Sequence, residues 1–196
     1  MFQVRFHGRG GQGVVTAAEI LSMAAFAEGR HAQAFPSFGS ERMGAPVVSF
    51  CRIDDLPIRT REPVMVPDAL IIQDVTLIHQ VDLFAGLLKD GYVLVNTSQH
   101  FDELEFGEFF NPFHRDRLLT CPATEIALEQ LGRPLPNAAM LGGFAALTSE
   151  ITLDAIEAAI RQRFPGTAGE HNVAAARAAF RFITLEEDGL TNASTD

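Results

Sequence analysis

The N-terminal segment constrains the fold of this chain more than any other part of the sequence. Side chains alternate between apolar and polar from Phe2 to His7, which is the period-2 pattern of a strand with one buried face. Glycines follow at positions 8, 10, 11 and 13, and apolar residues then recur at helical spacing from Val14 until Gly29 ends the pattern. Strand, glycine turn and helix in this order predict the first unit of an α/β fold.

The rest of the chain continues the alternation of strands and helices and then becomes helical. Apolar and β-branched runs predict strands at 31–35, 46–53, 69–72, 92–95 and 117–121, and helical patterns cover 74–88 and 124–131. The strands at 31–35 and 46–53 are either antiparallel neighbours or joined by a crossover. From residue 134 onward the sequence is alanine-rich and helical, with a last helix from about 170 to 185. We therefore predict an α/β fold with a mixed or parallel sheet, forming a single domain over residues 1–185, followed by a polar tail at 186–196.

Composition excludes several classes of protein. Cys51 and Cys121 are 70 positions apart with no CxxC motif, so neither a disulfide framework nor a zinc knuckle is indicated, and four thiolates for an iron–sulfur cluster are lacking. A net charge of −10 argues against binding to nucleic acid. No apolar run is long enough to span a membrane and no secretory signal opens the sequence, so we expect a cytoplasmic protein.

The glycine turn is a candidate phosphate site. Gly8, Gly10 and Gly13 satisfy GxGxxG between a strand and a helix, where backbone N–H groups and the helix terminus attract an anion, and Arg9 adds a positive charge. The alternative is that the glycines only allow the strand and helix to pack closely. No acidic residue ends the second predicted strand, where a site for NAD would use one to hold the ribose. In addition, seven of the fourteen arginines lie within the first 61 residues. A ligand with an additional phosphate, such as NADP or coenzyme A, is therefore favoured over NAD.

Two further segments carry candidate site residues. The segment Ser37–Pro46 combines Glu41 and Arg42 with two glycines immediately before a strand, and is either part of a site or an ordinary loop with a local ion pair. Asn96 and Thr97 end a buried strand at the edge where α/β proteins bind ligands, although both are also common turn residues. The acidic segment 99–116 contains five phenylalanines and is either a surface excursion that packs on the core or a lid or subunit contact.

Taken together, the motifs resemble a known family. HGRGGQGVVTAAEIL followed by PSFGSERMGAPVVSFCRI closely resembles the gamma subunit of the 2-oxoacid:ferredoxin (or other acceptor) oxidoreductases. The later NTS and NAAMLGGFAALTSEI extend the resemblance to about residue 185. In that family the gamma component helps to hold coenzyme A, the alpha and beta components carry thiamine diphosphate with magnesium, and a cluster-bearing component carries [4Fe–4S] clusters.

The resemblance implies a role for this chain. It would be a non-catalytic subunit of a hetero-oligomer that converts a 2-oxoacid, coenzyme A and an oxidised acceptor into acyl-CoA, carbon dioxide and reduced acceptor, with ferredoxin or an NAD-linked flavoprotein as the acceptor. The implied cofactor-binding residues are Gly8, Arg9, Gly10, Gly11, Gln12, Gly13, Glu41, Arg42, Gly44, Asn96 and Thr97. No catalytic residue and no metal ligand is implied in this chain.

One position departs from the family pattern. The second motif commonly reads GxERRGAPV, and here Met43 replaces the second arginine. The loss of this charge extends the range of expected substrates from pyruvate to bulkier branched or aromatic 2-oxoacids such as phenylglyoxylate. The alternatives to this function are an independent NADP- or flavin-binding Rossmann-like module and a purely structural assembly subunit.

Overall fold

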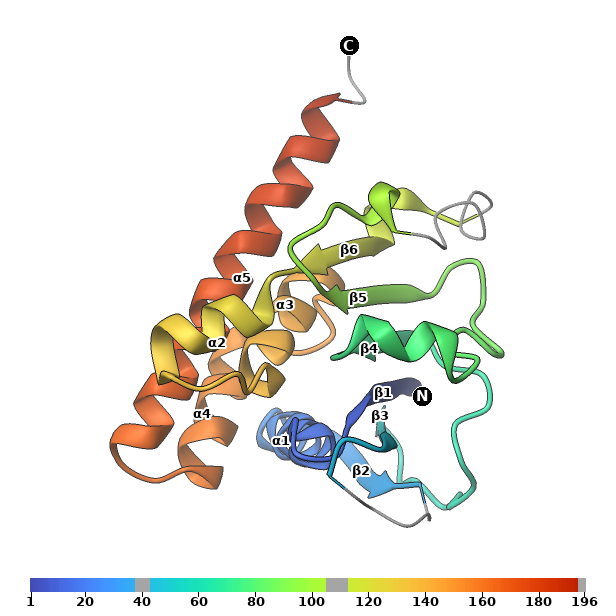
Figure 1. The fold of residues 1–196 in the computed structure, drawn as a ribbon. Coiled ribbons are helices and arrows are strands. Elements are labelled where there is room, and N and C mark those ends of the chain that lie inside the picture. The colour runs from blue at the N-terminus through green and yellow to red at the C-terminus, as the bar shows by residue number, and fades with distance from the viewer. Residues whose placement is uncertain (38–42, 105–112, 194–196) are drawn as a thin grey trace.

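The fold is built on one six-stranded mixed sheet. The computed structural model describes residues 1–37, 43–104 and 113–193, with backbone alone for 187–193. The strands lie in the order β2-β3-β1-β4-β5-β6 (Figure 1). They are β1 Phe2–Arg9, β2 His31–Pro36, β3 Pro46–Asp54, β4 Ala69–Ile72, β5 Tyr92–Asn96 and β6 Leu118–Cys121.

The direction of the strands brings the N-terminal motifs together. β1, β4, β5 and β6 run parallel, whereas β3 is antiparallel to both β1 and β2. Phe2 pairs with Ile53 and Arg9 pairs with Pro46, so the glycine turn after β1 lies beside the segment that enters β3. The predicted mixed sheet is confirmed, and the two strands whose relation the sequence left open are antiparallel neighbours.

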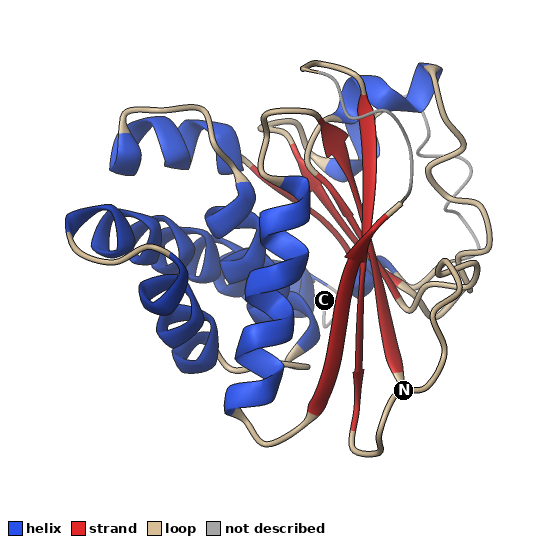
Figure 2. Cartoon of the chain, turned by 90° about the horizontal axis from the view of Figure 1, so that it is seen from below, coloured by secondary structure: helices blue, strands red, loops and turns tan. Residues whose placement is uncertain are grey.

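The sheet separates two different layers, as Figure 2 shows. One face is covered by five helices, α1 Val14–Ala27, α2 Ala123–Leu131, α3 Asn137–Thr148, α4 Leu153–Arg163 and α5 Thr167–Ala193. The other face carries loops and the short 3₁₀ helices η1 Val75–His79, η2 Phe101–Glu103 and η4 Arg115–Arg117. Helix α5 continues eight residues beyond the predicted end at 185. None of the described helices is both long and apolar enough to cross a membrane.

Alternation along the strands produces two cores, one on each face. Ile71 and Leu94 point toward the helices, while Ile72 and Val95 point into the smaller core under η1 and η2. All four side chains are at most 1% exposed. The parallel strands therefore read as continuous apolar runs because both of their faces are covered.

The helix predicted over 74–88 is wrong, and a buried arginine explains why. Only residues 75–79 are helical there, in a 3₁₀ turn. The Arg5 guanidinium donates to the carbonyl oxygens of Leu83 and Ala85 at 3.0 and 2.6 Å. Because these carbonyls accept from a side chain on β1, they are not available to continue a helix, and the apolar residues of this segment pack onto the sheet as irregular chain.

The phenylalanine-rich segment 99–116 is described at its two ends. Phe101 is buried in the smaller core and Phe113 packs against it. For these two residues the interpretation as aromatic side chains packed on the core is confirmed. Residues 105–112, with the other three phenylalanines, lie outside the described part of the chain.

Candidate functional site

The candidate site lies where the chain leaves neighbouring strands in opposite directions. After β1 the chain passes through the glycine turn into α1 on the helical face, and after β4 it passes through Asp74 into η1 on the other face (Figures 1 and 2). Parallel sheets bind ligands at such switch points, outside the carboxyl ends of their strands. The predicted glycine motif therefore lies at the edge of the sheet where a ligand is expected.

The backbone of the glycine turn is open to an anion. Gly11 and Gly13 have φ of 95° and 75°, a region that favours glycine, and Gly13 is the N-cap residue directly before α1. No side chain in the described part of the chain caps this helix, and its first turn contains no acidic residue. The N–H groups of the first turn, with the partial positive charge of the helix, are thus directed at this edge.

Close packing also accounts for two of the glycines. A Cβ atom at Gly8 would lie 2.6 Å from Cγ2 of Val14, and one at Gly13 would lie 2.8 Å from Nδ2 of Asn137, the first residue of α3. The packing interpretation and the anion interpretation of the motif are therefore compatible. Gly11 differs, because a Cβ there would meet only the flexible end of Met43, with Cε at 2.9 Å.

The two N-terminal motifs form one backbone unit. The N–H of Gly10 donates to the carbonyl of Ala45 at 2.9 Å, and the N–H of Gly44 donates to the carbonyl of Gly10 at 3.1 Å. Met43, whose side chain is 86% exposed, forms a parallel bridge with Gly10 and lies over Gly11. Met43 therefore forms part of the surface that a ligand at the glycine turn would meet. Glu41 and Arg42 lie outside the described residues.

Arg9 is held by the protein at the edge of the glycine turn. Its Nε donates to Oδ2 of Asp74 at 3.0 Å, its Nη2 to Oγ1 of Thr76 at 2.8 Å, and its Nη1 to the carbonyl of Gly44 at 3.0 Å. Asp74 also accepts from Nε2 of Gln12 at 3.1 Å, and Gln12 Oε1 accepts from the backbone N–H of Arg9 at 2.7 Å. Arg9 and Gln12 thereby fix the shape of the turn.

The charge of Arg9 is largely balanced by Asp74. Burial would raise the pKa of the Asp74 carboxyl, but hydrogen bonds from Thr76 and Gln12 and the charge of Arg9 together hold this pKa below its usual value. Asp74 is therefore an anion at neutral pH. Because it is already paired with Asp74, the Arg9 guanidinium is less available to an anion than a free guanidinium would be.

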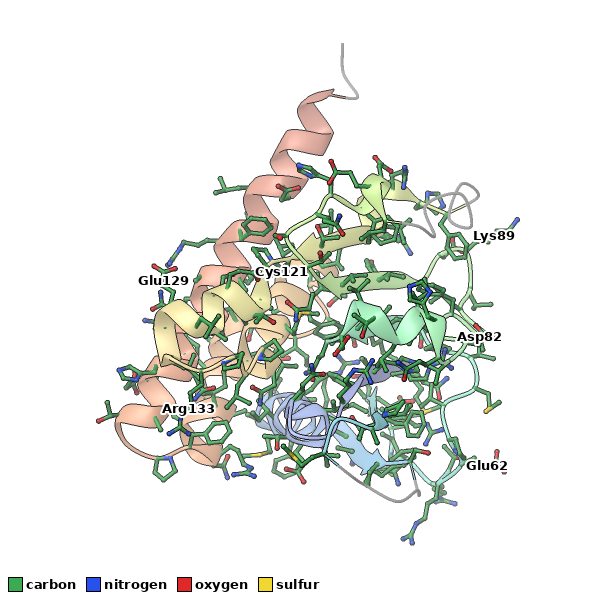
Figure 3. All side chains as sticks on the ribbon, viewed as in Figure 1. Glu62, Asp82, Lys89, Cys121, Glu129 and Arg133 are labelled. Atoms are coloured by element: carbon green, nitrogen blue, oxygen red, sulfur yellow. The ribbon has the colours of Figure 1, made fainter. Side chains whose placement is uncertain are left out.

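The other described arginines of the N-terminal region do not reach this edge. Arg30 precedes β2 at the opposite edge of the sheet, where it is bound to Glu150 and Asp55. Arg59 and Arg61 lie between the end of β3 and the start of β4, also at that opposite edge, and the only lysine, Lys89, lies in the turn before β5 (Figure 3). The expectation that the N-terminal arginines gather around a phosphorylated ligand is wrong for these three residues. The reason is that the turn before β2 and the connection from β3 to β4 both lie at the amino-terminal ends of the parallel strands, away from the glycine turn.

Asn96 and Thr97 lie at the predicted edge but have structural partners. The Asn96 amide donates to the Gln73 carbonyl and to Thr124 Oγ1, both at 2.8 Å, and its Oδ1 accepts from the Thr124 N–H at 3.0 Å. Thr97 Oγ1 accepts from the N–H of Gln99. Asn96 thus ties the ends of β4 and β5 to the first turn of α2.

Sequence reasoning missed a buried carboxamide beneath the glycine turn. Gln73 follows β4 directly and is 1% exposed, and neither Nε2 nor Oε1 of its side chain has a partner in the described part of the chain. Its backbone N–H donates to the His7 carbonyl at 2.7 Å, and its Cβ approaches the position that a Gly8 side chain would occupy. The signal that identified Asn96, a polar residue at the end of a buried strand, applies equally to Gln73.

His7 is buried and neutral. Its Nε2 accepts from Nε of Arg5 at 3.1 Å. Burial, together with the charge of Arg5, lowers the pKa of His7 to about 3. An uncharged imidazole in the smaller core has no charge with which to bind a phosphate, so His7 is part of the packing.

A small cavity lies beside the Arg9 network. It has a volume of about 300 Å³ and opens between η1 and η2 at the carboxyl ends of β4 and β5. Its lining is part apolar and part polar: Val75, Thr76, Ile78, His79, Gln99, Glu103 and Leu104. Because Thr76 lines the cavity and also binds Arg9, a ligand with its phosphates at the glycine turn has space for further groups along this edge.

Both cysteines are free and buried, and Cys121 is labelled in Figure 3. Burial raises the pKa of the Cys51 thiol, and burial with the nearby charge of Glu125 raises that of Cys121 to about 12. We therefore expect the native protein to react with a thiol reagent at a small fraction of the rate of the unfolded protein, which should titrate two thiols. Rapid labelling of either cysteine in the native state would contradict this expectation.

In the described residues no three metal-binding side chains come together.

Comparison with known proteins agrees with this architecture. Residues 3–182 match the family described as pyruvate ferredoxin/flavodoxin oxidoreductase. The chain is 49% identical over 180 residues to the pyruvate synthase subunit PorC of Methanothermobacter marburgensis, covering 92% of this chain and 96% of that protein. It is 48% identical over 187 residues to the pyruvate/ketoisovalerate oxidoreductases common subunit gamma of Pyrococcus abyssi, covering 95% and 100% of the two chains.

A solved structure has the same fold. The crystal structure of the pyruvate oxidoreductase subunit PORC of Thermotoga maritima superposes with a TM-score of 0.77 at 35% identity, covering 92% of this chain and 95% of that one. The family match extends over both N-terminal motifs, the sheet and nearly all of the helical layer. The chain therefore belongs to the pyruvate ferredoxin/flavodoxin oxidoreductase family, as one of its gamma subunits.

Proposed function

We propose that this chain binds and positions coenzyme A within a multisubunit 2-oxoacid oxidoreductase. The complex would convert a 2-oxoacid, coenzyme A and an oxidised acceptor into acyl-CoA, carbon dioxide and the reduced acceptor. Thiamine diphosphate with magnesium and the [4Fe–4S] clusters would belong to the alpha, beta and cluster-bearing partner chains, and the acceptor would be ferredoxin or an NAD-linked flavoprotein. This chain would contribute the orientation of the thiol rather than a reacting group.

The observation that carries the proposal is the uncapped start of α1 at the switch point. Gly11 and Gly13 present backbone there with no side chain, and the first turn of the helix supplies N–H donors without an acidic competitor. Coenzyme A carries several phosphate oxygens that such donors can bind. The neighbouring cavity under η1 supports a ligand that is longer than a phosphate alone.

The network around Arg9 gives the site its rigidity. Arg9 bonds to Asp74, Thr76 and Gly44, so it connects β1, β4 and the second motif at one point. A turn that is already fixed before the ligand arrives loses less conformational entropy on binding. Arg9 thus acts as a positioning residue in this proposal, with its charge as a secondary attraction for phosphate.

The substrate class follows from the relatives and from Met43. The names of the relatives refer to pyruvate and, for the Pyrococcus abyssi subunit, also to ketoisovalerate. We propose pyruvate or a branched 2-oxoacid as the substrate of the complex that contains this chain. The exposed thioether of Met43 beside Gly11 adds an apolar contact where the family pattern has a second arginine.

Substituting alanine for Gly11 tests the proposal in the assembled complex. The new Cβ projects from the surface of the turn, so it should raise the KM for coenzyme A about tenfold or more, as expected for the loss of a hydrogen bond to a charged group. The rate of 2-oxoacid decarboxylation without coenzyme A should stay near that of the wild type. Both rates are measured on the same preparation.

Gly29→Ala is the matched control for this substitution. Gly29 also has a positive φ, of 81°, but a Cβ there meets nothing within 4 Å, and the residue lies at the other end of α1. Both variants therefore carry a similar backbone strain, while only Gly11→Ala alters the turn. An equal KM for coenzyme A in the two variants, or parallel loss of both half-reactions in Gly11→Ala, would overturn the proposed function.

A further inference from the structure

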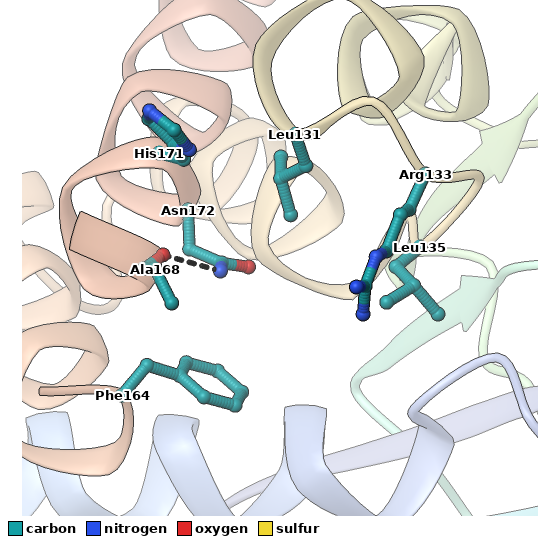
Figure 4. Close-up of a pocket in the computed structure, with 7 residues that line it drawn as sticks. All are labelled: Leu131, Arg133, Leu135, Phe164, Ala168, His171 and Asn172. Carbon is teal, nitrogen blue, oxygen red and sulfur yellow. Dashed lines mark hydrogen bonds between the residues drawn. The ribbon is translucent and has the colours of Figure 1, made fainter.

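A second cavity, separate from the glycine turn, lies within the helical layer (Figure 4). It has a volume of about 390 Å³ and opens between the α2–α3 connection on one side and the α4–α5 corner on the other. It shares no lining residue with the cavity under η1. Nothing in the proposed handling of coenzyme A uses it.

One side of this cavity carries a cationic hydrogen-bond donor, and the other side carries a hydrogen-bond acceptor. Arg133 extends along one side, and no acidic side chain in the described part of the chain forms an ion pair with it (Figure 4). Asn172 lies on the other side and is 8% exposed. Its Nδ2 donates to the Ala168 carbonyl at 2.8 Å, which fixes the orientation of the amide. The Oδ1 atom is therefore the free end of the amide, and it points toward the cavity as an acceptor.

The space between these groups is apolar. Leu131 borders it from the end of α2, Leu135 from the α2–α3 connection, and the ring of Phe164 from the end of α4 (Figure 4). The cavity thus offers a cation, a hydrogen-bond acceptor and a hydrocarbon surface within one volume. This is the pattern of a specific small-molecule site, an apolar lining with a few polar groups that fix orientation.

We propose that this cavity binds a free amino acid with a branched or aromatic side chain. The carboxylate would pair with the Arg133 guanidinium, the ammonium group would donate to Oδ1 of Asn172, and the side chain would pack on Leu131, Leu135 and Phe164. A 2-oxoacid of the same size offers a carbonyl oxygen where the amino acid offers a donor. Because Asn172 presents an acceptor, the amino acid is favoured over the corresponding 2-oxoacid or simple carboxylic acid.

Calorimetric titration of the purified chain tests this site with four probes. L-Leucine is the test ligand, 4-methylpentanoate lacks the ammonium group, isopentylamine lacks the carboxylate, and glycine lacks the apolar side chain. We expect saturable binding of L-leucine and at least tenfold weaker binding of each of the other three. Absence of saturable L-leucine binding, or equal affinity for 4-methylpentanoate, would overturn the assignment.

Variants of two exposed arginines locate the binding. Arg133→Gln should weaken L-leucine binding about tenfold or more, while Arg59→Gln, at the amino-terminal edge of the sheet, should leave it unchanged. The thermal midpoint of each variant without ligand establishes that it is folded. Undiminished binding by Arg133→Gln would place the ligand elsewhere and overturn the proposal. Because coenzyme A binding is assayed separately, failure here leaves the role of the glycine turn untouched.

Discussion

Replacing Gly142 by alanine is expected to lower the free energy of unfolding by about 3 kcal/mol, at the upper end of the cost of overpacking a core. Gly142 lies in α3 where it crosses α5, and a Cβ there would lie 2.0 Å from the carbonyl oxygen of Ala176 and 2.7 Å from its Cα. These atoms belong to the backbone of the partner helix, so they cannot move aside by rotation. The two helices must separate to accommodate one methyl group, which opens the larger core.

Gly143→Ala is the control for this prediction. It lies in the same helix and gains the same helical propensity, but its Cβ would meet side-chain atoms rather than backbone, Cδ2 of Leu94 at 3.1 Å and Cγ1 of Ile183 at 3.4 Å. We expect a change of less than about 1 kcal/mol, because these side chains can adjust. Urea unfolding of both variants measures the difference. Equal midpoints for Gly142→Ala and Gly143→Ala would show that the crossing of α3 and α5 is not limited by contact between backbones.

Glu157→Gln is expected to lower the free energy of unfolding by about 2 kcal/mol at neutral pH, in the range for hydrogen bonds to charged groups. Glu157 is 5% exposed and accepts two hydrogen bonds from Arg177, at 2.5 and 2.6 Å. Arg161 adds a third at 3.3 Å. The glutamine keeps the size of the side chain but leaves two arginines beside a neutral, buried group. The measurement is urea unfolding at pH 7.

The effect of this substitution should depend on pH. The hydrogen bonds from Arg177, opposed by burial, hold the pKa of Glu157 below its usual value, with further lowering from Arg161. The stabilisation by a carboxylate of lowered pKa is complete above its unfolded pKa and is lost as the pH falls through its folded pKa. The stability difference between wild type and Glu157→Gln should therefore shrink on acidification from pH 6 toward about pH 3, near and below the usual pKa of glutamate.

The exposed partner of the same cluster provides the comparison. Glu170 also binds Arg161, at 2.8 Å, but its side chain is 58% exposed. Glu170→Gln should therefore change stability much less than Glu157→Gln, because water already solvates this carboxylate. A constant difference between wild type and Glu157→Gln across the acidic range would contradict the assignment of Glu157 as the titrating group.

The sequence predicted those parts of the fold that depend on local pattern. The alternation in β1, the helical spacing in α1 and the apolar runs of β4 and β5 all reflect burial of side chains near one another in the chain. The predicted helix at 74–88 failed because its carbonyl groups at 83 and 85 accept from Arg5, which lies 78 and 80 residues earlier. No pattern within the segment itself carries that information.

The sequence predicted where the candidate residues lie in the fold, but only part of their contacts. The glycine turn and Asn96 lie at the carboxyl ends of their strands, as predicted, because strand ends are visible in sequence. The partner of Arg9 was not, because Asp74 follows a different strand and meets Arg9 only when β1 and β4 pair. The number of arginines in the first 61 residues does not show that they share one site. Arg30 and Arg9, for example, lie at opposite ends of the strands.

The backbone bonds between Gly10 and the Gly44–Ala45 segment have an evolutionary consequence. Each partner presents its N–H and carbonyl to the other, so neither segment can shift along its strand without breaking both bonds. Insertions within either motif should therefore be rare among relatives. Substitutions at position 43 should covary with those at position 11, because the side chain at 43 occupies the space above Gly11. Divergence of ligand preference in this family would then proceed by paired changes across the two motifs.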